Sequence, residues 1–367
     1  MRRMLWFGCA VVLLLAMLGC AKRNPSEPNA AGSSVAPAGA APTAARPAVD
    51  PTAAKAPVPA GSGARLVATY FYYWYDLPSG PHSTQLTDRP KDPATSYRNV
   101  GWFKRQFSDM TEAGIDVALA VYWGPAEPSS GPGLVNMARA VNELRAEGKR
   151  APSIAIFLDT GTVAQWPLAQ RDLTKPENRA RFYALVKTFY EALPRDQWAV
   201  VDGKVLFWMW AAWFDIKFDR AFFDYVAEQF AKDFGMPLYV VGDSSWRYAS
   251  GPANLPVQQR PQMPLDAYYE WGASLRGFSD LRSGVAQVGP GYDERPLKAA
   301  SRSDRFADRE GGLFYERQLQ QAVASKNRIL AIETWNEFHE ASEIAETVEY
   351  GRQYLDLTRK YTELFKR

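Results

Sequence analysis

Cysteine and histidine are scarce in this chain, and their scarcity excludes several kinds of functional site. Both cysteines, Cys9 and Cys20, lie within the first twenty residues, so the rest of the chain has no disulfide, no cysteine nucleophile and no thiolate metal site. With His82 and His339 as the only imidazoles, a zinc site of the usual ligand types is nearly excluded, and we expect no cofactor. No Gly-x-Ser-x-Gly sequence supports a serine nucleophile. Carboxylates therefore remain as the natural acid and base.

Long basic runs are also missing from the chain. The formal net charge is +3, and the basic residues are spread through the sequence, with no long run outside the N-terminal segment. A protein that binds nucleic acid needs basic patches that neutralise phosphates. Nucleic acid is therefore a poor candidate partner.

The N-terminus has the pattern of an export signal over residues 1–20. A basic start precedes an apolar run, Met4 to Leu18, that is too short to span a membrane comfortably. The sequence Ala16-Met17-Leu18-Gly19-Cys20 resembles a bacterial lipobox, which predicts lipidation of Cys20; ordinary signal cleavage nearby is the alternative. Ala21 after the cysteine favours the outer membrane by the same resemblance. We therefore expect an exported, membrane-anchored protein of the cell envelope, periplasmic or surface-exposed.

Two regions of different composition follow the signal. Residues 21–64 are dominated by Ala, Pro, Ser and Gly, with almost no large apolar side chain, so they cannot bury enough surface to offset the entropy of ordering. We predict that they form a disordered tether. Residues 65–367 carry nearly all of the aromatic residues and are long enough for one large domain or two small ones, of which we favour the single domain.

Within residues 65–367, short β-branched or aromatic runs alternate with longer amphipathic stretches, which predicts repeated βα units and a parallel sheet. Eight such units favour an α/β fold of the (β/α)8 TIM-barrel type, and no Gly-rich phosphate loop follows the first strand to support a dinucleotide-binding fold. The connection near Pro252, Pro256 and Pro261 leaves little room for a helix. The expected strands are 66–72, 116–122, 153–158, 205–210, 238–241, 267–269, 285–288 and 329–334; the expected helices are 99–113, 134–147, 176–192, 219–234, 275–282, 313–325 and 347–365.

Reacting groups in such a barrel project from the carboxyl ends of the strands, so polar residues at those ends need explaining. After the last strand, Trp335-Asn336-Glu337-Phe338-His339-Glu340 places two carboxylates three residues apart. On a helical turn they would share one face, where one is expected to hold a proton while the other stays charged. Glycoside hydrolysis needs this division of labour, and the close spacing favours a retaining reaction. A solvated helix start is the alternative for the Glu337 and Glu340 pair.

A second indication of a carbohydrate site is the aromatic strand that leads into Tyr73, Trp74 and Asp76, because aromatic rings stack on the apolar faces of sugars. Other rings of that strand are expected to pack in the core. Glu333 lies inside the last expected strand, where a charge needs a partner that the sequence does not reveal. Further substrate-binding candidates, each with a structural role as the alternative, are Trp123, Asp159, Tyr269, Tyr292, Asp293, Trp335, Asn336 and His339.

Several of these motifs, in order along the barrel, resemble glycoside hydrolase family 99, the endo-α-mannosidase group, and its uncharacterised bacterial relatives. They are Tyr72-Tyr73-Trp74-Tyr75, Asp159-Thr160, Pro290-Gly291-Tyr292-Asp293, residues 335–340 and Glu349-Tyr350-Gly351. The resemblance implies retaining hydrolysis of mannose-containing glycans, with Glu337 as base toward the sugar 2-hydroxyl in forming a 1,2-anhydro intermediate. It implies that Glu340 is general acid and then base, and that Tyr73 lines the site. The chain departs from the family where that family usually has Trp, Gly-Thr and Gln and this chain has Phe338, Ala341-Ser342 and Glu343.

The sequence therefore predicts a cell-envelope glycoside hydrolase that acts on a polysaccharide or a mannose-containing glycan. A catalytically inactive lipoprotein that binds carbohydrate during exopolysaccharide or capsule assembly is the alternative. The presence of both carboxylates favours the enzyme, because a protein that only binds glycans has no need of an acid and base pair.

Overall fold

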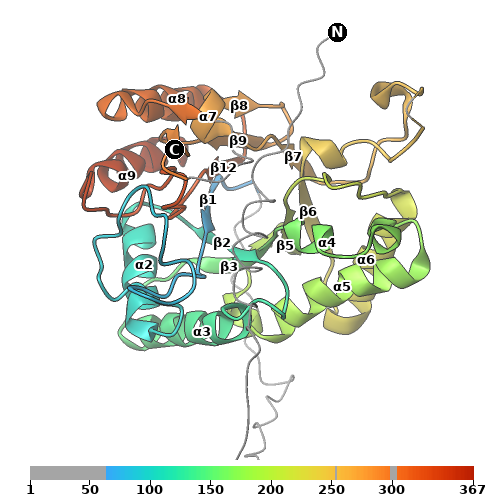
Figure 1. Cartoon of the computed structure of the whole chain (residues 1–367), viewed down its shortest axis with the longest axis horizontal. Coiled ribbons are helices and arrows are strands. Elements are labelled where there is room, and N and C mark those ends of the chain that lie inside the picture. The colour runs from blue at the N-terminus through green and yellow to red at the C-terminus, as the bar shows by residue number, and fades with distance from the viewer. Residues whose placement is uncertain (1–62, 253, 298–303) are drawn as a thin grey trace, which may run out of the picture.

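The computed structural model describes residues 63–252, 254–297 and 304–367 (Figure 1). The predicted export signal, Cys20 and nearly all of the predicted tether lie outside these residues. No helix within the described residues is both long enough and apolar enough to cross a membrane.

In the described part of the chain, eight parallel strands follow one another around a nearly closed, barrel-like sheet. Their order is β7-β6-β5-β3-β2-β1-β12-β9, so neighbours along the chain are mostly neighbours in space. Across the remaining side of the ring, β7 and β9 approach each other, but no ladder joins them among the described residues. The strands are β1 (Leu66–Phe71), β2 (Val117–Tyr122), β3 (Ser153–Leu158), β5 (Lys204–Met209), β6 (Leu238–Asp243), β7 (Ala267–Tyr269), β9 (Val285–Val288) and β12 (Ile329–Ile332).

Short antiparallel pairs extend this sheet and its loops. They are β4 (Val200–Val201) with β5, β8 (Ser279–Asp280) with β9, and β10 (Tyr292–Asp293) with β11 (Phe306–Ala307). The sheet and its helices confirm the predicted mixed α/β fold, with a nearly closed barrel-like sheet.

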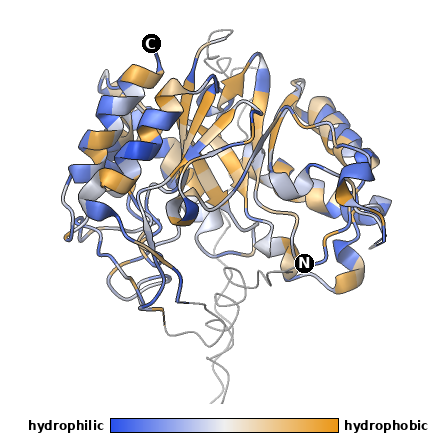
Figure 2. Cartoon of the chain, turned by 90° about the horizontal axis from the view of Figure 1, so that it is seen from above, coloured by the Kyte–Doolittle hydropathy of each residue, from blue (hydrophilic) through white to orange (hydrophobic). Residues whose placement is uncertain are grey.

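The strands form where the sequence is almost continuously apolar, because each is buried on both faces. All six residues of β1 are buried. Tyr70 of β1 points into the barrel, where its ring centroid lies 4.7 Å from that of Phe157 and 6.0 Å from that of Trp208. Phe71 points the other way, onto Phe103 and its neighbours in the first helix. Figure 2 shows the result, a hydrophobic sheet inside a more hydrophilic set of helices.

Helices cover the outside of the barrel (Figure 1). Local signals fix their ends: the α6 helix begins where the Asp219 side chain accepts a hydrogen bond from the Phe222 N–H, and it ends at Gly235, whose φ of 69° suits glycine. The helices are α2 (Val100–Glu112), α3 (Ser130–Ala146), α4 (Gly161–Ala164), α5 (Pro176–Glu191), α6 (Arg220–Phe234), α7 (Ala273–Arg276), α8 (Leu313–Ala324) and α9 (Gln353–Phe365).

Two connections differ from a regular βα unit. The predicted helix over 275–282 is wrong: α7 has only four residues, because Gly277 leaves the helical region with a φ of 91° and the chain then forms β8. Over its described residues, 244–252 and 254–266, the proline-rich connection after β6 has no long helix, as expected, and contains a three-residue 3₁₀ turn at Val257–Gln259. These two connections lie beside the open side of the ring.

Candidate active site

The loop that follows β12 carries Glu337 and Glu340. It forms a turn rather than the expected helical turn, and Ala341 adopts a positive φ of 43°. The Ser342 N–H donates to the Glu337 carbonyl at 3.3 Å, which closes the turn. The Asp293 N–H donates to the Glu340 carbonyl at 2.8 Å from a neighbouring segment. The loop is therefore fixed by contacts from distant parts of the chain.

Glu337 is buried and held by polar neighbours. Its Oε1 atom lies 2.9 Å from His339 Nδ1, accepts the His339 backbone N–H at 3.2 Å and lies 3.5 Å from the Tyr75 hydroxyl. The Tyr75 ring stacks on the His339 ring, with centroids 5.4 Å apart. Such a carboxylate keeps a single orientation, which suits a base that must reach one proton.

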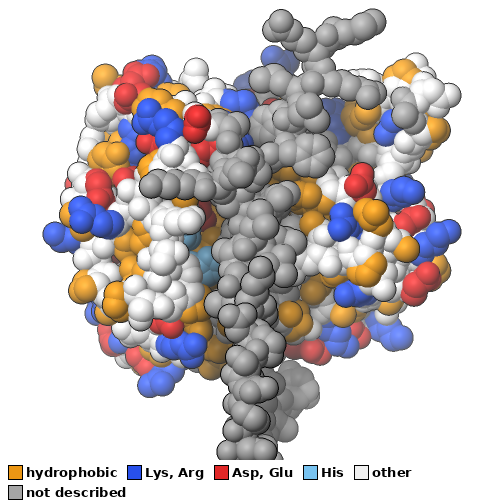
Figure 3. All heavy atoms as spheres, in the orientation of Figure 1, with side chains coloured by type: hydrophobic (Ala, Val, Ile, Leu, Met, Phe, Trp, Pro, Cys, Tyr) orange, Lys and Arg blue, Asp and Glu red, His pale blue; other side chains and the backbone are white. Residues whose placement is uncertain are grey.

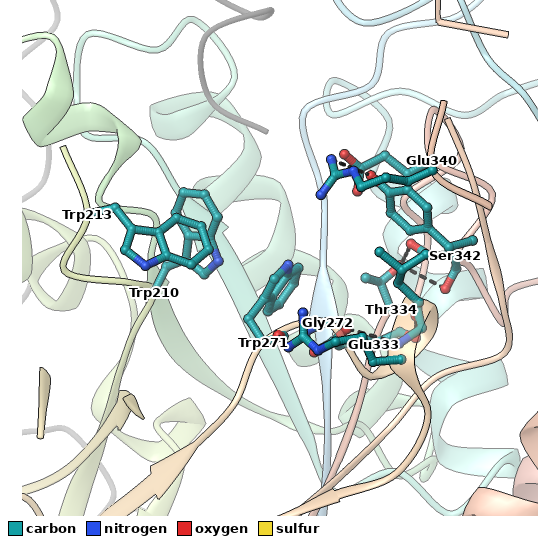
Figure 4. Close-up of a pocket in the computed structure, with 13 residues that line it drawn as sticks. Trp210, Trp213, Trp271, Gly272, Glu333, Thr334, Glu340 and Ser342 are labelled. Carbon is teal, nitrogen blue, oxygen red and sulfur yellow. Dashed lines mark hydrogen bonds between the residues drawn. The ribbon is translucent and has the colours of Figure 1, made fainter. Parts of the chain in front are cut away.

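Glu340 lines a cleft of about 530 Å³, a volume that includes the open mouth. Figure 4 shows Trp210 and Trp213 together on one side, Trp271 between the two sides, and Glu340 on the other side. These three indoles meet at steep angles, with 70° between Trp210 and Trp213 and 81° between Trp210 and Trp271. A carboxyl group that faces a corner of aromatic rings is an arrangement suited to a sugar ring.

One buried hydrogen-bond donor in this cleft has no partner in the described part of the protein. The indole N–H of Trp210 is buried and has no hydrogen-bond partner among the residues that the structure describes. A buried donor without a partner costs free energy, which an incoming hydroxyl oxygen would recover. Trp210 is not among the candidates from the sequence, because the sequence does not distinguish a tryptophan at the end of a strand that lines a site from one that packs in the core.

Asp159 lies within electrostatic range of both glutamates. Burial raises its pKa to about 7, the Gly161 N–H and the Trp123 indole work against that rise, and the charges of Glu337 and Glu340 add to it. The Gly161 N–H donates to Asp159 Oδ1 at 2.8 Å. Trp123 packs edge-on to Trp74, with centroids 6.3 Å apart. The structure therefore brings three predicted candidates, Asp159, Trp123 and Trp74, to the same mouth as the two glutamates.

His82 is a neighbour of this group that sequence reasoning did not select. Its ring stacks on Trp74 at 4.5 Å and lies 6.0 Å from His339. Burial, and then the charge of His339, lower the pKa of His82 to about 3, so its imidazole is neutral at ordinary pH.

Glu333, the unexplained carboxyl of the sequence, lines the same cleft as Glu340. It accepts hydrogen bonds from the Gly272 N–H at 2.7 Å, the Ser274 N–H at 3.2 Å and Gln287 Nε2 at 2.6 Å. Burial raises its pKa to about 7, while these donors lower it. The partners lie 46 to 61 residues away in the sequence, so only the folded chain reveals them.

Tyr292 also lines the cleft, next to Arg305. Arg305 makes a bidentate contact with Glu294, with Nε to Oε1 at 2.8 Å and Nη2 to Oε2 at 2.6 Å. Burial alone would raise the pKa of Glu294, but the hydrogen bonds and charge of Arg305 outweigh it and lower that pKa to about 2. This ion pair fixes a guanidinium at the cleft wall.

Other predicted residues support the walls of the site rather than its opening. Tyr73 is turned outward: its ring fills the space beside Gly133 of α3, where an added Cβ would lie 2.5 Å from it. This follows from strand alternation, which sends Phe71 and Tyr73 to the same outer face. Asp76 accepts from Ser96 Oγ at 2.6 Å and pairs with Arg98 in a loop.

The remaining four candidates are bound within the barrel wall or on its rim. The Tyr269 hydroxyl donates to the Met209 carbonyl, the Trp335 indole donates to Gln106 Oε1, the Asn336 amide bonds both backbone groups of Tyr72, and Asp293 pairs with Arg295. Their side chains are thereby committed to structural contacts.

One face of the molecule is drawn in Figure 3, with charged side chains around its edge and hydrophobic and histidine atoms nearer its centre. Within the described ranges, no three histidine, aspartate or glutamate side chains converge in a way that could hold a metal ion.

The sequence matches one family model over residues 65–366, almost the whole described body. That model is described as a domain of unknown function, DUF5010. The chain belongs to the DUF5010 family. No protein with a curated description matches its sequence.

Solved structures share the fold of this DUF5010 protein. The family 99 endo-α-mannosidase from Bacteroides thetaiotaomicron, in complex with bis-tris propane, is 17% identical, covers 82% of this chain and 97% of its own, and gives a TM-score of 0.57. A glycoside hydrolase-like protein is 15% identical, covers 86% of this chain and 98% of its own, and gives a TM-score of 0.59. The expected similarity to the endo-α-mannosidase group is confirmed at the level of the fold.

Proposed function

We propose that this DUF5010 protein is a retaining glycoside hydrolase of the cell envelope, acting on a polysaccharide or a mannose-containing glycan. The observation that carries the proposal is the position of Glu340, opposite Trp210, Trp213 and Trp271 in the cleft at the end of the barrel. The shared fold with glycoside hydrolase structures supports it further.

In the proposed reaction, Glu340 gives its proton to the glycosidic oxygen as the bond to the anomeric carbon breaks. Glu337 takes the proton of the neighbouring 2-hydroxyl, whose oxygen closes onto the anomeric carbon to form a 1,2-anhydro sugar. Water then opens this ring, Glu340 accepts the proton of the water and Glu337 returns a proton to the 2-oxygen. Two inversions at the anomeric carbon give net retention.

The contacts around Glu337 and the groups at the same mouth suit this reaction. Glu337 is held by His339 and Tyr75 in one orientation, as a base that must reach a single hydroxyl requires. Asp159 has a raised pKa and is partly protonated near neutral pH. It supplies a hydrogen-bonding group for a sugar hydroxyl at the same mouth. The indoles supply the stacking surface that holds the ring in place.

The test is release of reducing ends from mannan and from exopolysaccharide by the purified chain. Glu340→Gln should lower the rate by a factor of about 100 to 10,000 while glycan binding stays within twofold, because general acid catalysis is lost and the shape is kept. Glu363→Gln, on the exposed outer side of α9, is the matched control and should behave as the parent. Binding without activity in the parent would favour the inactive carbohydrate-binding lipoprotein instead.

We also propose that Cys20 is lipidated and anchors the protein to the outer membrane. The proposal rests on the lipobox-like sequence Ala16 to Cys20 and on Ala21 after it. Cys20→Ala should move the protein from the membrane fraction to the soluble fraction and abolish labelling by a radioactive fatty acid. Labelling that persists in this variant would contradict the assignment.

A further inference from the structure

A buried ionic cluster lies behind the loop that carries Glu337 and Glu340. Arg309 Nη2 lies 2.6 Å from Glu343 Oε1 and 3.4 Å from Asp88 Oδ2. The three side chains are 7%, 1% and 8% exposed, so the cluster has almost no contact with solvent. Charges this deeply buried are stable only with close partners, which makes each member dependent on the others.

Arg309 is held in place by more than charge. Its guanidinium lies 4.5 Å from the ring centroid of Tyr350 and 4.5 Å from that of Tyr354 in α9. Its stem passes Gly291, where an added Cβ would lie 2.4 Å from Arg309 Cγ. A planar cation between aromatic rings keeps a fixed position, which a lysine ammonium cannot reproduce.

The cluster reaches the active loop through backbone hydrogen bonds. Arg309 Nη1 donates to the Glu343 carbonyl at 3.0 Å, three residues beyond Glu340. On the other side, the N–H groups of Thr87 and Asp88 both donate to the Phe338 carbonyl, at 2.9 and 3.2 Å, and the Thr87 hydroxyl donates to the His339 carbonyl. The loop is therefore held both before and after Glu340 by residues that meet at Arg309.

The balance of charge strengthens this dependence. Two carboxyl groups face one guanidinium. Burial raises the pKa of Glu343 well above its usual range, with Arg309 opposing and Asp88 adding to the rise. Burial likewise raises the pKa of Asp88, against the charge of Arg309. Loss of the one cation would leave both carboxyl groups buried without compensation.

We propose that Arg309 is a positioning residue for Glu340: it holds residues 336–345 in the geometry that the acid needs, and it does so through Glu343 and Asp88. The inference rests on the proposed hydrolase function for its catalytic consequence only. Arg309 does not line the cleft, so its loss should change the chemical step rather than the binding of glycan.

The experiment compares amide hydrogen exchange, thermal unfolding and steady-state kinetics of the full chain with those of Arg309→Lys. The matched control is Arg317→Lys, at an exposed arginine of α8 that pairs with Glu310 at 2.8 Å. In Arg309→Lys, exchange in peptides covering 336–345 should rise at least tenfold, while peptides of β2 and β3 stay unchanged. With a glycan that the parent hydrolyses, kcat should fall at least tenfold and KM should stay within twofold.

A second variant keeps the test decisive if Arg309→Lys does not fold. Glu343→Gln removes the carboxyl group but leaves the backbone bond from Arg309 to the Glu343 carbonyl, so exchange in 336–345 should rise less than in Arg309→Lys, by about threefold. Unchanged exchange of this loop in both variants would overturn the inference, as would a rise in KM that accounts for the whole loss of kcat/KM. If the parent hydrolyses no glycan, the proposed function fails, whereas the exchange result still decides the role of Arg309.

Discussion

Asp159 should make the folded protein less stable as the pH rises, and Asp159→Asn should remove that effect. Burial and the charges of Glu337 and Glu340 raise the pKa of Asp159 from 3.8 to about 7 in the folded state. The folded chain therefore binds this proton more tightly than the unfolded chain, so the stabilising contribution is complete below pH 3.8 and is lost as the pH rises toward 7.

The magnitude follows from the two pKa values. Linkage gives a loss of about 2 kcal/mol at pH 5 and about 4 kcal/mol at pH 8, relative to the protonated carboxyl. Asparagine does not titrate, and its side-chain oxygen can still accept the Gly161 N–H. The free energy of unfolding of Asp159→Asn, measured relative to that of the parent, should therefore rise by about 2 to 3 kcal/mol from pH 5 to pH 8. A difference in stability that does not depend on pH leaves this change unaffected.

Urea unfolding of parent and variant at pH 5 and pH 8 measures this change. Asp224→Asn, on the outer side of α6 with a side chain 46% exposed, is the control for loss of a carboxyl at the surface. A free-energy difference between parent and Asp159→Asn that is the same at both pH values would refute the reasoning. The same series in glycan-release assays would report whether loss of the Asp159 carboxyl lowers turnover.

Other parts of the structure give further predictions. Trp210→Phe keeps an aromatic ring but removes the buried N–H, so KM for a glycan should rise by about fivefold to tenfold in kinetic assays, whereas Trp102→Phe, packed outside the barrel, should leave KM unchanged. The pKa of Glu294 is lowered to about 2, so its stabilising contribution is present above pH 4.5 and is lost as the pH falls toward 2. In Arg305→Gln, the fall in melting temperature from pH 7 to pH 3 should therefore be smaller than in the parent. Phe230→Ala, at a fully buried position of α6, should cost about 3 to 5 kcal/mol in urea unfolding, and a cost below 1 kcal/mol would contradict the packing described.

The strands could be predicted closely from the sequence, because each is a continuous buried run between turn residues. The bounds of β3, β7 and β9 match the expectation to the residue. The short α7 could not be predicted, since the amphipathic pattern of 275–282 contains a glycine whose positive φ depends on packing at the open side of the ring. Local patterns fix local structure, and tertiary contacts decide where they end.

The candidate site was predictable in part for a related physical reason. Glu337 and Glu340 were found because they follow a recognisable strand, and Glu340 lies in the cleft. Tyr73 illustrates the limit: its place in an aromatic run suggests the opening, but its ring points outward, two residues beyond the end of β1, and fills the space beside Gly133. The partners of Glu333 and the role of Arg309 could not be predicted for a different reason, because they depend on residues tens or hundreds of positions away.

The open side of the ring has a consequence for how this family can diversify. Because no ladder joins β7 to β9 among the described residues, the segment between Glu270 and Phe278 is fixed by turns and side chains, not by the register of a parallel pair. Trp271, Arg276 and three residues between them supply part of the cleft lining. Insertions or deletions there leave every parallel strand pairing intact. This short stretch can therefore change in length and sequence without disturbing the sheet, and substitutions that aim to alter what the cleft binds should begin with it.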